Sequence, residues 1–167
     1  MKRALLLIAA CAAIYTVAAW WAAARLPETG VAMHVNGAGE VDRYGTRASA
    51  INFFIGLGAL VVVLAIGSVC LSRFGPLKRL NIPHKEYWTQ PQRGPVVRQM
   101  IMWDMAVIFG ITLLGLSSVP INIALMSSNP AGVSMLTLLV PIGAMLIAMV
   151  GYLIWMVTRR YRPKAPE

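Results

Sequence analysis

The residues whose types and spacing could do chemistry are gathered in one short polar segment, residues 25–48. Imidazole and carboxylate groups in such proximity can hold a cation, and with an amide and a phenol they can recognise a polar ligand. A transition-metal site needs further strong ligands, because His34 is the only one in this segment and no helical His spacing accompanies it. Two interpretations remain open, a ligand or recognition surface and a set of side chains that pair locally, and we expect no bound metal. The residues concerned are His34, Asn36, Glu40, Asp42 and Tyr44.

The backbone of this segment is predicted to form a small β-hairpin. Residues 31–35 alternate in the manner of a short strand, and residues 40–44 alternate again. Between them lies Asn36-Gly37, a turn dipeptide whose residues both tolerate positive φ. A hairpin here would bring His34 within hydrogen-bonding range of residues 40–42. We therefore predict that His34 and Asp42 chiefly position the hairpin.

The remainder of the chain shows no catalytic constellation. Cys11 and Cys70 lie in apolar stretches without a CxxC or CxxH neighbour, which is typical of buried thiols. Asp104 lies in the first turns of an apolar stretch, where we expect it to reach Arg98 or lipid headgroups at the membrane interface. No Ser/His/Asp set, HExxH motif or Gly-rich phosphate loop is present. We expect neither an enzyme nor a cofactor.

The elements that must position these residues are membrane spans. Hydrophobic residues make up 58% of the 167 residues and charged residues 13%, against about 45–50% and 25% in soluble proteins. The apolar residues fall into four blocks, each long enough for a helix to cross the bilayer. We predict one all-α domain, residues 1–167, that forms a four-helix transmembrane bundle. The spans are about 4–24, 49–71, 100–127 and 133–158.

The distribution of basic residues predicts the orientation. Twelve of the fifteen Lys and Arg residues lie in the N-terminus, the 72–99 segment and the tail, against three in the 25–48 segment. Cytoplasmic segments carry such an excess. We therefore expect both termini inside, an extracytoplasmic hairpin, and a multi-pass protein of a bacterial inner membrane. The net charge of +9 has no interleaved aromatics of the kind that nucleic-acid binding requires, so we expect no nucleic-acid partner.

Two further patterns concern partners. The basic 72–99 segment contains Lys85, Tyr87 and Trp88, which suit either the headgroup level of the bilayer or a docking surface for a cytoplasmic protein. Small residues recur at helical spacing in the last two blocks, a pattern typical of close helix packing and of homo- or hetero-oligomer contacts. They are Gly110, Gly115, Ser118, Gly143, Ala144, Ala148 and Gly151.

The polar segments also resemble a known family. Leu26-Pro27 followed by His34-Val35-Asn36-Gly37-Ala38-Gly39-Glu40-Val41-Asp42-Arg43-Tyr44-Gly45 resembles the signature of an uncharacterised membrane domain of SdpI-type immunity proteins. The Asn-x-Pro-x-Lys-Glu-Tyr-Trp stretch that begins at Asn81 is similar to one that follows the family's second span. The resemblance covers about residues 1–90. It implies a helical membrane protein; the characterised type is longer, confers immunity to a secreted toxin and holds a small cytoplasmic repressor at the membrane.

Two functional hypotheses follow. The first is a non-enzymatic membrane protein for sensing, ligand binding or immunity, with a secreted peptide or protein on the outer face and a cytoplasmic partner at residues 72–99. The second is a small transporter or an accessory subunit of a larger membrane complex. A polar cavity through the bundle would favour transport, whereas a closed bundle with a structured hairpin would favour binding.

Overall fold

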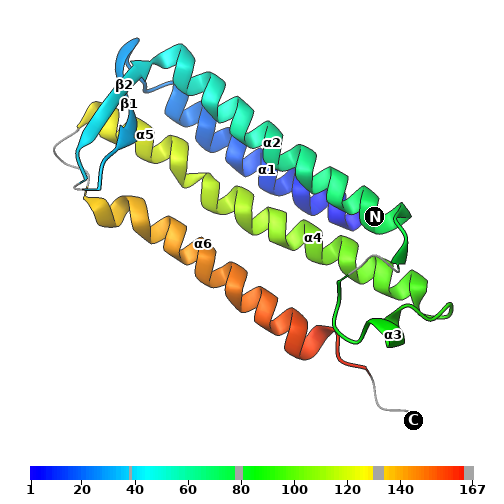
Figure 1. Cartoon of the computed structure of the whole chain (residues 1–167). Coiled ribbons are helices and arrows are strands. Elements are labelled where there is room, and N and C mark those ends of the chain that lie inside the picture. Colours follow the sequence, from blue (N-terminus) through cyan, green and yellow to red (C-terminus); the bar gives the residue numbers. More distant parts are fainter. Residues whose placement is uncertain (38, 78–80, 130–133, 164–167) are drawn as a thin grey trace.

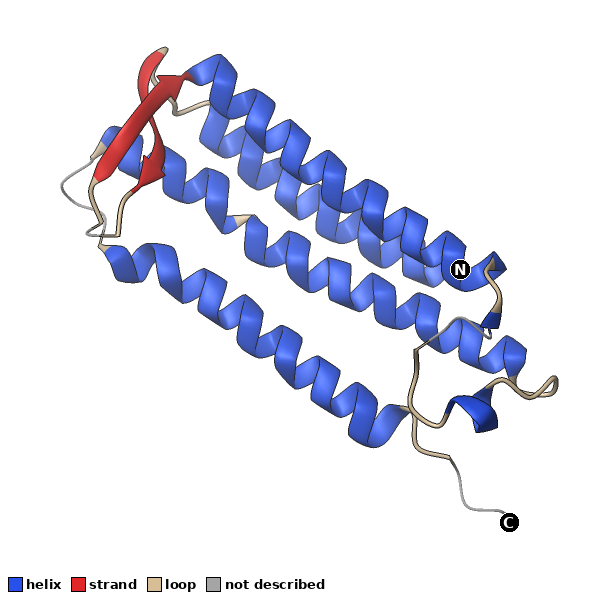
Figure 2. Cartoon of the chain, viewed as in Figure 1, coloured by secondary structure: helices blue, strands red, loops and turns tan. Residues whose placement is uncertain are grey.

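The structure is a computed structural model of the chain and describes residues 1–167 except 38, 78–80, 130–133 and 164–167. Its helices are α1 (Lys2–Ala23), α2 (Arg47–Phe74), α3 (Lys85–Trp88), α4 (Gly94–Leu116), α5 (Ser118–Ser128) and α6 (Met135–Trp155). A π-helical turn, η2 (Met156–Arg160), continues α6, and strands β1 (Thr29–Val35) and β2 (Val41–Thr46) lie between α1 and α2. The chain is thus predominantly helical (Figure 2).

Four helical segments are long and apolar enough to cross a membrane, as predicted. The third is longer than expected, because it begins at Gly94 instead of near Met100. Pro95 explains the earlier start: its fixed φ suits the first turn of a helix, where a missing N–H costs nothing. The described helices run side by side, and we name the two ends of the bundle the hairpin end and the basic end (Figure 1). The hairpin end carries β1 and β2; the basic end carries the start of α1, α3, the start of α4 and the end of α6.

A break divides the third span at Ser117, visible as a short loop between α4 and α5 (Figure 2). Pro120 has no N–H to donate to the Leu116 carbonyl, and its ring crowds that carbonyl. The Ser117 hydroxyl donates at 2.9 Å to the Leu113 carbonyl, which also accepts the Ser117 backbone N–H. The break lets α5 tilt toward the hairpin. Pro141 lies inside α6 without ending that helix.

The core lies between α1, α2 and α4. Ala4 and Ile8 of α1 pack against Ala65 of α2 and Ala106 of α4 in one buried cluster. A Cβ on Gly110 would lie 3.2 Å from Cys11 Sγ, so this glycine lets α4 approach α1 closely.

The last span packs on one side only. A Cβ on Gly115 of α4 would overlap the Met145 side chain, so this glycine lets Met145 of α6 pack closely against α4. A Cβ added to Gly143 or Gly151 would have no neighbour within 4 Å, so the expectation of close packing was wrong at these two residues. None of the described residues in the apolar window of this span is buried within the chain.

Candidate functional site

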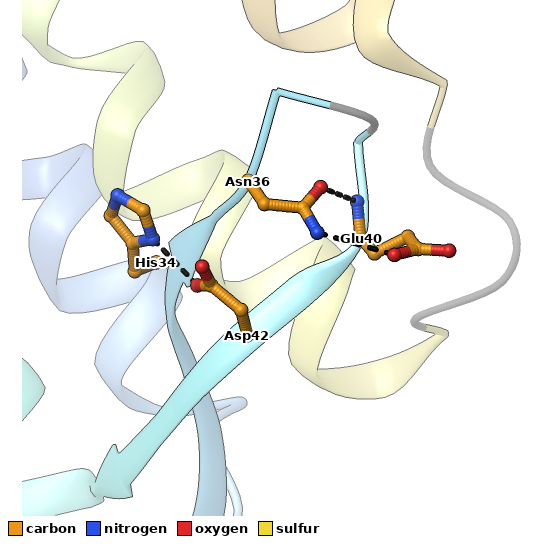
Figure 3. A network of polar contacts seen from close by, with 4 residues as sticks. All are labelled: His34, Asn36, Glu40 and Asp42. Carbon is orange, nitrogen blue, oxygen red and sulfur yellow. Dashed lines mark hydrogen bonds and ion pairs between the residues drawn. The ribbon is translucent and has the colours of Figure 1, made fainter.

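The hairpin forms as predicted, and it brings the polar residues together. β1 and β2 pair antiparallel, with His34 opposite Arg43 and Ala32 opposite Tyr44. The His34 Nδ1 atom lies 2.5 Å from Asp42 Oδ1, and the side chains are 55% and 44% exposed (Figure 3). The Tyr44 side chain is exposed beside them. The pair thus lies on the solvent-accessible surface of the hairpin.

The turn is closed by a second pair. Asn36 Oδ1 accepts a 3.0 Å hydrogen bond from the Glu40 amide, and Asn36 Nδ2 donates at 3.2 Å to Glu40 Oε2 (Figure 3). Gly39 adopts φ +89°, which a residue with a side chain would resist. The four residues therefore form two adjacent pairs. In the described part of the chain, no three His, Cys, Asp or Glu side chains come together in a way that could hold a metal.

The hairpin is fixed to the bundle by buried contacts. The Ala32 amide donates a 3.0 Å hydrogen bond to Ser127 Oγ of α5. Val31 is fully buried in a cluster with Phe54 of α2 and Ala124 of α5. At the start of α2, Thr46 and Ser49 form a capping box, so β2 runs directly into a well-capped helix. The hairpin is an ordered part of the fold.

A cavity of about 240 Å³ lies beneath the hairpin, and we call it the hairpin cavity. Its wall combines β1 with the first turns of α2, the length of α5 and the first half of α6. Most of its lining is apolar, including Phe53, Met126 and Leu138, while His34 lines it on the hairpin side. Ligand sites commonly have this composition, an apolar wall with a few polar groups.

Asn122 of α5 is the notable polar group in the hairpin cavity. Asn122 is 9% exposed, and its side-chain amide makes no hydrogen bond to any part of the chain that the structure describes. The amide atoms are not closed off from the cavity, because among the described residues only Arg160 Nε is both buried and without a hydrogen-bond partner. The arrangement therefore presents both a donor and an acceptor to whatever fills the cavity. Asn122 was not among the residues predicted from the sequence.

A second polar cluster surrounds Asp104 near the basic end, and here the expectation was wrong. Asp104 is completely buried instead of lying at the interface. Its carboxylate accepts 2.7 Å hydrogen bonds from the hydroxyls of Tyr152 and Tyr161. Arg160 Nε lies 2.7 Å from Oδ1, an ion pair whose angle is too poor for a hydrogen bond. Arg98, the partner expected from sequence, instead donates to the backbone carbonyls that end α2, of Ser72 and Arg73.

The residues predicted for a lipid or partner interface separate in the structure. Lys85 is exposed, and the Tyr87 ring lies 3.5 Å from the Arg93 guanidinium. Trp88 is 8% exposed, and its Nε1 donates a 2.9 Å hydrogen bond to the Tyr161 carbonyl. Its ring packs against Tyr161 and the start of α4. Trp88 therefore fastens the loop to the helices.

Neither a family model, a curated protein nor a solved structure matches this chain.

Proposed function

We propose that this chain is a non-enzymatic, multi-pass membrane protein that binds a secreted peptide or protein at the hairpin end. Binding inserts an apolar side chain into the hairpin cavity, and the His34–Asp42 pair and Tyr44 form the rim. The excess of basic residues in the terminal and 72–99 segments supports the proposed orientation, with both termini in the cytoplasm of a bacterial cell and the hairpin outside. Sensing or immunity is the role that such binding serves, in keeping with the resemblance of residues 1–90 to SdpI-type proteins.

The observation that carries this proposal is the Asn122 amide, which makes no hydrogen bond to the described chain and lies in a mostly apolar cavity. A peptide supplies an apolar side chain that packs against the cavity wall. It also supplies a backbone N–H or C=O that forms a hydrogen bond with the Asn122 amide. Because the hairpin is hydrogen-bonded to α5, the cavity is preformed, which reduces the entropy lost on binding.

The bundle interior favours binding over transport. The buried polar residues in the described chain are Ser72, Asp104, Ser117 and Asn122. The two serine hydroxyls donate to carbonyls of their own helices. Asp104 and Asn122 lie toward opposite ends, and apart from Ser117 the described residues buried between them, such as Leu113, are apolar. The described residues thus form no polar path along the bundle.

One observation supports the second candidate, an accessory subunit. The apolar window of the last span has no described residue buried within the chain, although α6 forms one wall of the hairpin cavity. Another membrane helix could pack on this face of α6 without displacing any contact of the bundle. Such a role is compatible with ligand binding at the hairpin end.

Photo-cross-linking in intact cells tests the proposal. Benzoylphenylalanine replaces Phe53, which lines the hairpin cavity and is 44% exposed, or Phe74, which is 73% exposed at the other end of α2. We expect a discrete peptide or protein adduct at position 53 that Asn122→Leu abolishes, and none at position 74. Identical lipid adducts at both positions, or an adduct that Asn122→Leu leaves unchanged, would contradict the proposal.

A further inference from the structure

A larger cavity lies at the basic end, and we propose that it binds the phosphate group of an anionic ligand. It has a volume of about 630 Å³, and we call it the basic cavity. Its walls are the first turn of α1, one side of α4 and the end of the last span. Residues of all three elements contribute, so the cavity is a feature of the packed bundle and not of one helix end.

The charge of the basic cavity is strongly positive. Lys2, Arg3 and Arg160 line it, and no carboxylate is among the described residues that line it. Lys2 and Arg3 make no ion pair with any described residue. Asp104, buried behind the wall, contacts Arg160 through Nε. The two terminal nitrogens of the guanidinium make no hydrogen bond to the described chain.

The positive region continues into a neighbouring cavity of about 260 Å³. The two cavities share Met1, Gln99 and Met102, and the second adds Arg73 and Arg98. Arg98 is held in place by the carbonyls of Ser72 and Arg73, at 3.1 and 3.0 Å. A fixed guanidinium loses less side-chain entropy when it binds an oxyanion, which favours phosphate over weakly held counterions.

The position of the basic cavity points to its most accessible source of phosphate, a membrane phospholipid. The cavity lies at the ends of three helical segments that are long and apolar enough to span a membrane, where headgroups are expected. Trp103, 38% exposed, lines it, as aromatic residues do at a membrane interface. Val96 and Met100 add apolar wall for the start of an acyl chain. Free inorganic phosphate is the other source of the same chemistry.

Native mass spectrometry of the full chain in non-ionic detergent tests the proposal. The probes are phosphatidylglycerol, phosphatidylcholine and inorganic phosphate. The variant Lys2→Gln/Arg3→Gln removes two charges from the basic cavity, and Arg159→Gln/Arg162→Gln removes two exposed charges at the same end but outside the cavity. A hydrogen bond to a charged group contributes about tenfold or more to binding, and only basic residues that line the cavity can make one to the bound phosphate. We expect selective retention of phosphatidylglycerol, weakened at least tenfold in the first variant and less than threefold in the second.

The outcomes separate the two sources. Retention of phosphatidylglycerol that millimolar phosphate does not displace identifies a lipid headgroup, and displacement by phosphate identifies a site for the free ion. Equal retention of phosphatidylcholine and phosphatidylglycerol without phosphate binding would overturn the proposal. Equal losses in the two variants would also overturn it, because a general surface charge would then account for the binding.

Discussion

The phenol of Tyr161 donates a 2.7 Å hydrogen bond to the Asp104 carboxylate, across 57 residues of sequence. The Tyr161 carbonyl accepts the indole N–H of Trp88. One residue, 1% exposed, thereby joins the end of the last span to the third span and to the loop that contains α3. Burial, and then its hydrogen bond to Asp104, raises the pKa of the Tyr161 phenol, so the hydroxyl remains a donor well above neutral pH.

Asp104→Ala is expected to destabilise the bundle severely. It leaves Arg160 and two phenols without their shared partner, and the loss of one member of a buried ion pair costs about 3–5 kcal/mol. Asp42→Ala is the control, because its pair with His34 is exposed and such pairs contribute about 0–1 kcal/mol. Thermal unfolding of both variants in detergent measures the difference. Equal stability of the two would show that the Asp104 cluster is not formed.

Trp88→Phe is expected to loosen the loop without unfolding the helices. The substitution keeps an aromatic ring and removes the N–H that Tyr161 accepts, a loss of about 1 kcal/mol. Hydrogen exchange at residues 84–90 should become faster by several-fold. Tyr87→Phe serves as the control, since the Tyr87 hydroxyl makes no hydrogen bond to the described chain. Unchanged exchange in Trp88→Phe would refute the anchoring role.

Gly58→Ala is expected to destabilise the contact between α1 and α2. A Cβ there would lie 2.5 Å from Tyr15 Cε1. The ring cannot move freely, because the Tyr15 hydroxyl donates a 2.7 Å hydrogen bond to the Phe54 carbonyl. We expect a loss of about 1–3 kcal/mol in the free energy of unfolding. Gly56→Ala, with nothing within 4 Å, should be neutral or stabilising, and a reversed order in the two melting curves would contradict this packing.

Ser127→Ala is expected to release the hairpin from α5. The Ala32 amide, on a residue that is 2% exposed, would lose its acceptor, and amide exchange in β1 should accelerate by about tenfold. Ser128→Ala should have no such effect, because its hydroxyl donates only to the Leu125 carbonyl of its own helix. Wild-type exchange at residues 31–44 as fast as in a free peptide would show that the hairpin is not ordered.

Much of this arrangement could be predicted from the sequence. Apolar blocks identify spans because a helix must reach a minimum length to cross the bilayer. Asn36-Gly37 identifies the position of the turn, although the positive φ is adopted by Gly39 and by neither residue of the dipeptide. The His34–Asp42 contact followed from strand alternation. Each of these inferences rests on local chemistry within a few residues.

The Asp104 cluster and the hairpin cavity could not be predicted in this way. Both depend on which faces of distant helices meet, which the sequence specifies only through packing. Tyr152 and Arg160 are eight residues apart, a spacing that places two side chains on the same side of a helix. This spacing could have suggested a polar helix face that contacts a buried carboxylate. Asn122 lies in an apolar block near Pro120, and only the break at Ser117 places it beneath the hairpin.

The side of the membrane on which the hairpin lies is the most direct test of the proposed binding site. In a background of Cys11→Ala and Cys70→Ala, single cysteines at Thr29 and Asn81 are labelled in intact cells with a membrane-impermeant maleimide. We predict labelling of Thr29→Cys from outside and of Asn81→Cys only after the membrane is opened. Labelling of both from one side, or of Asn81→Cys alone from outside, would contradict an outward-facing binding site at the hairpin.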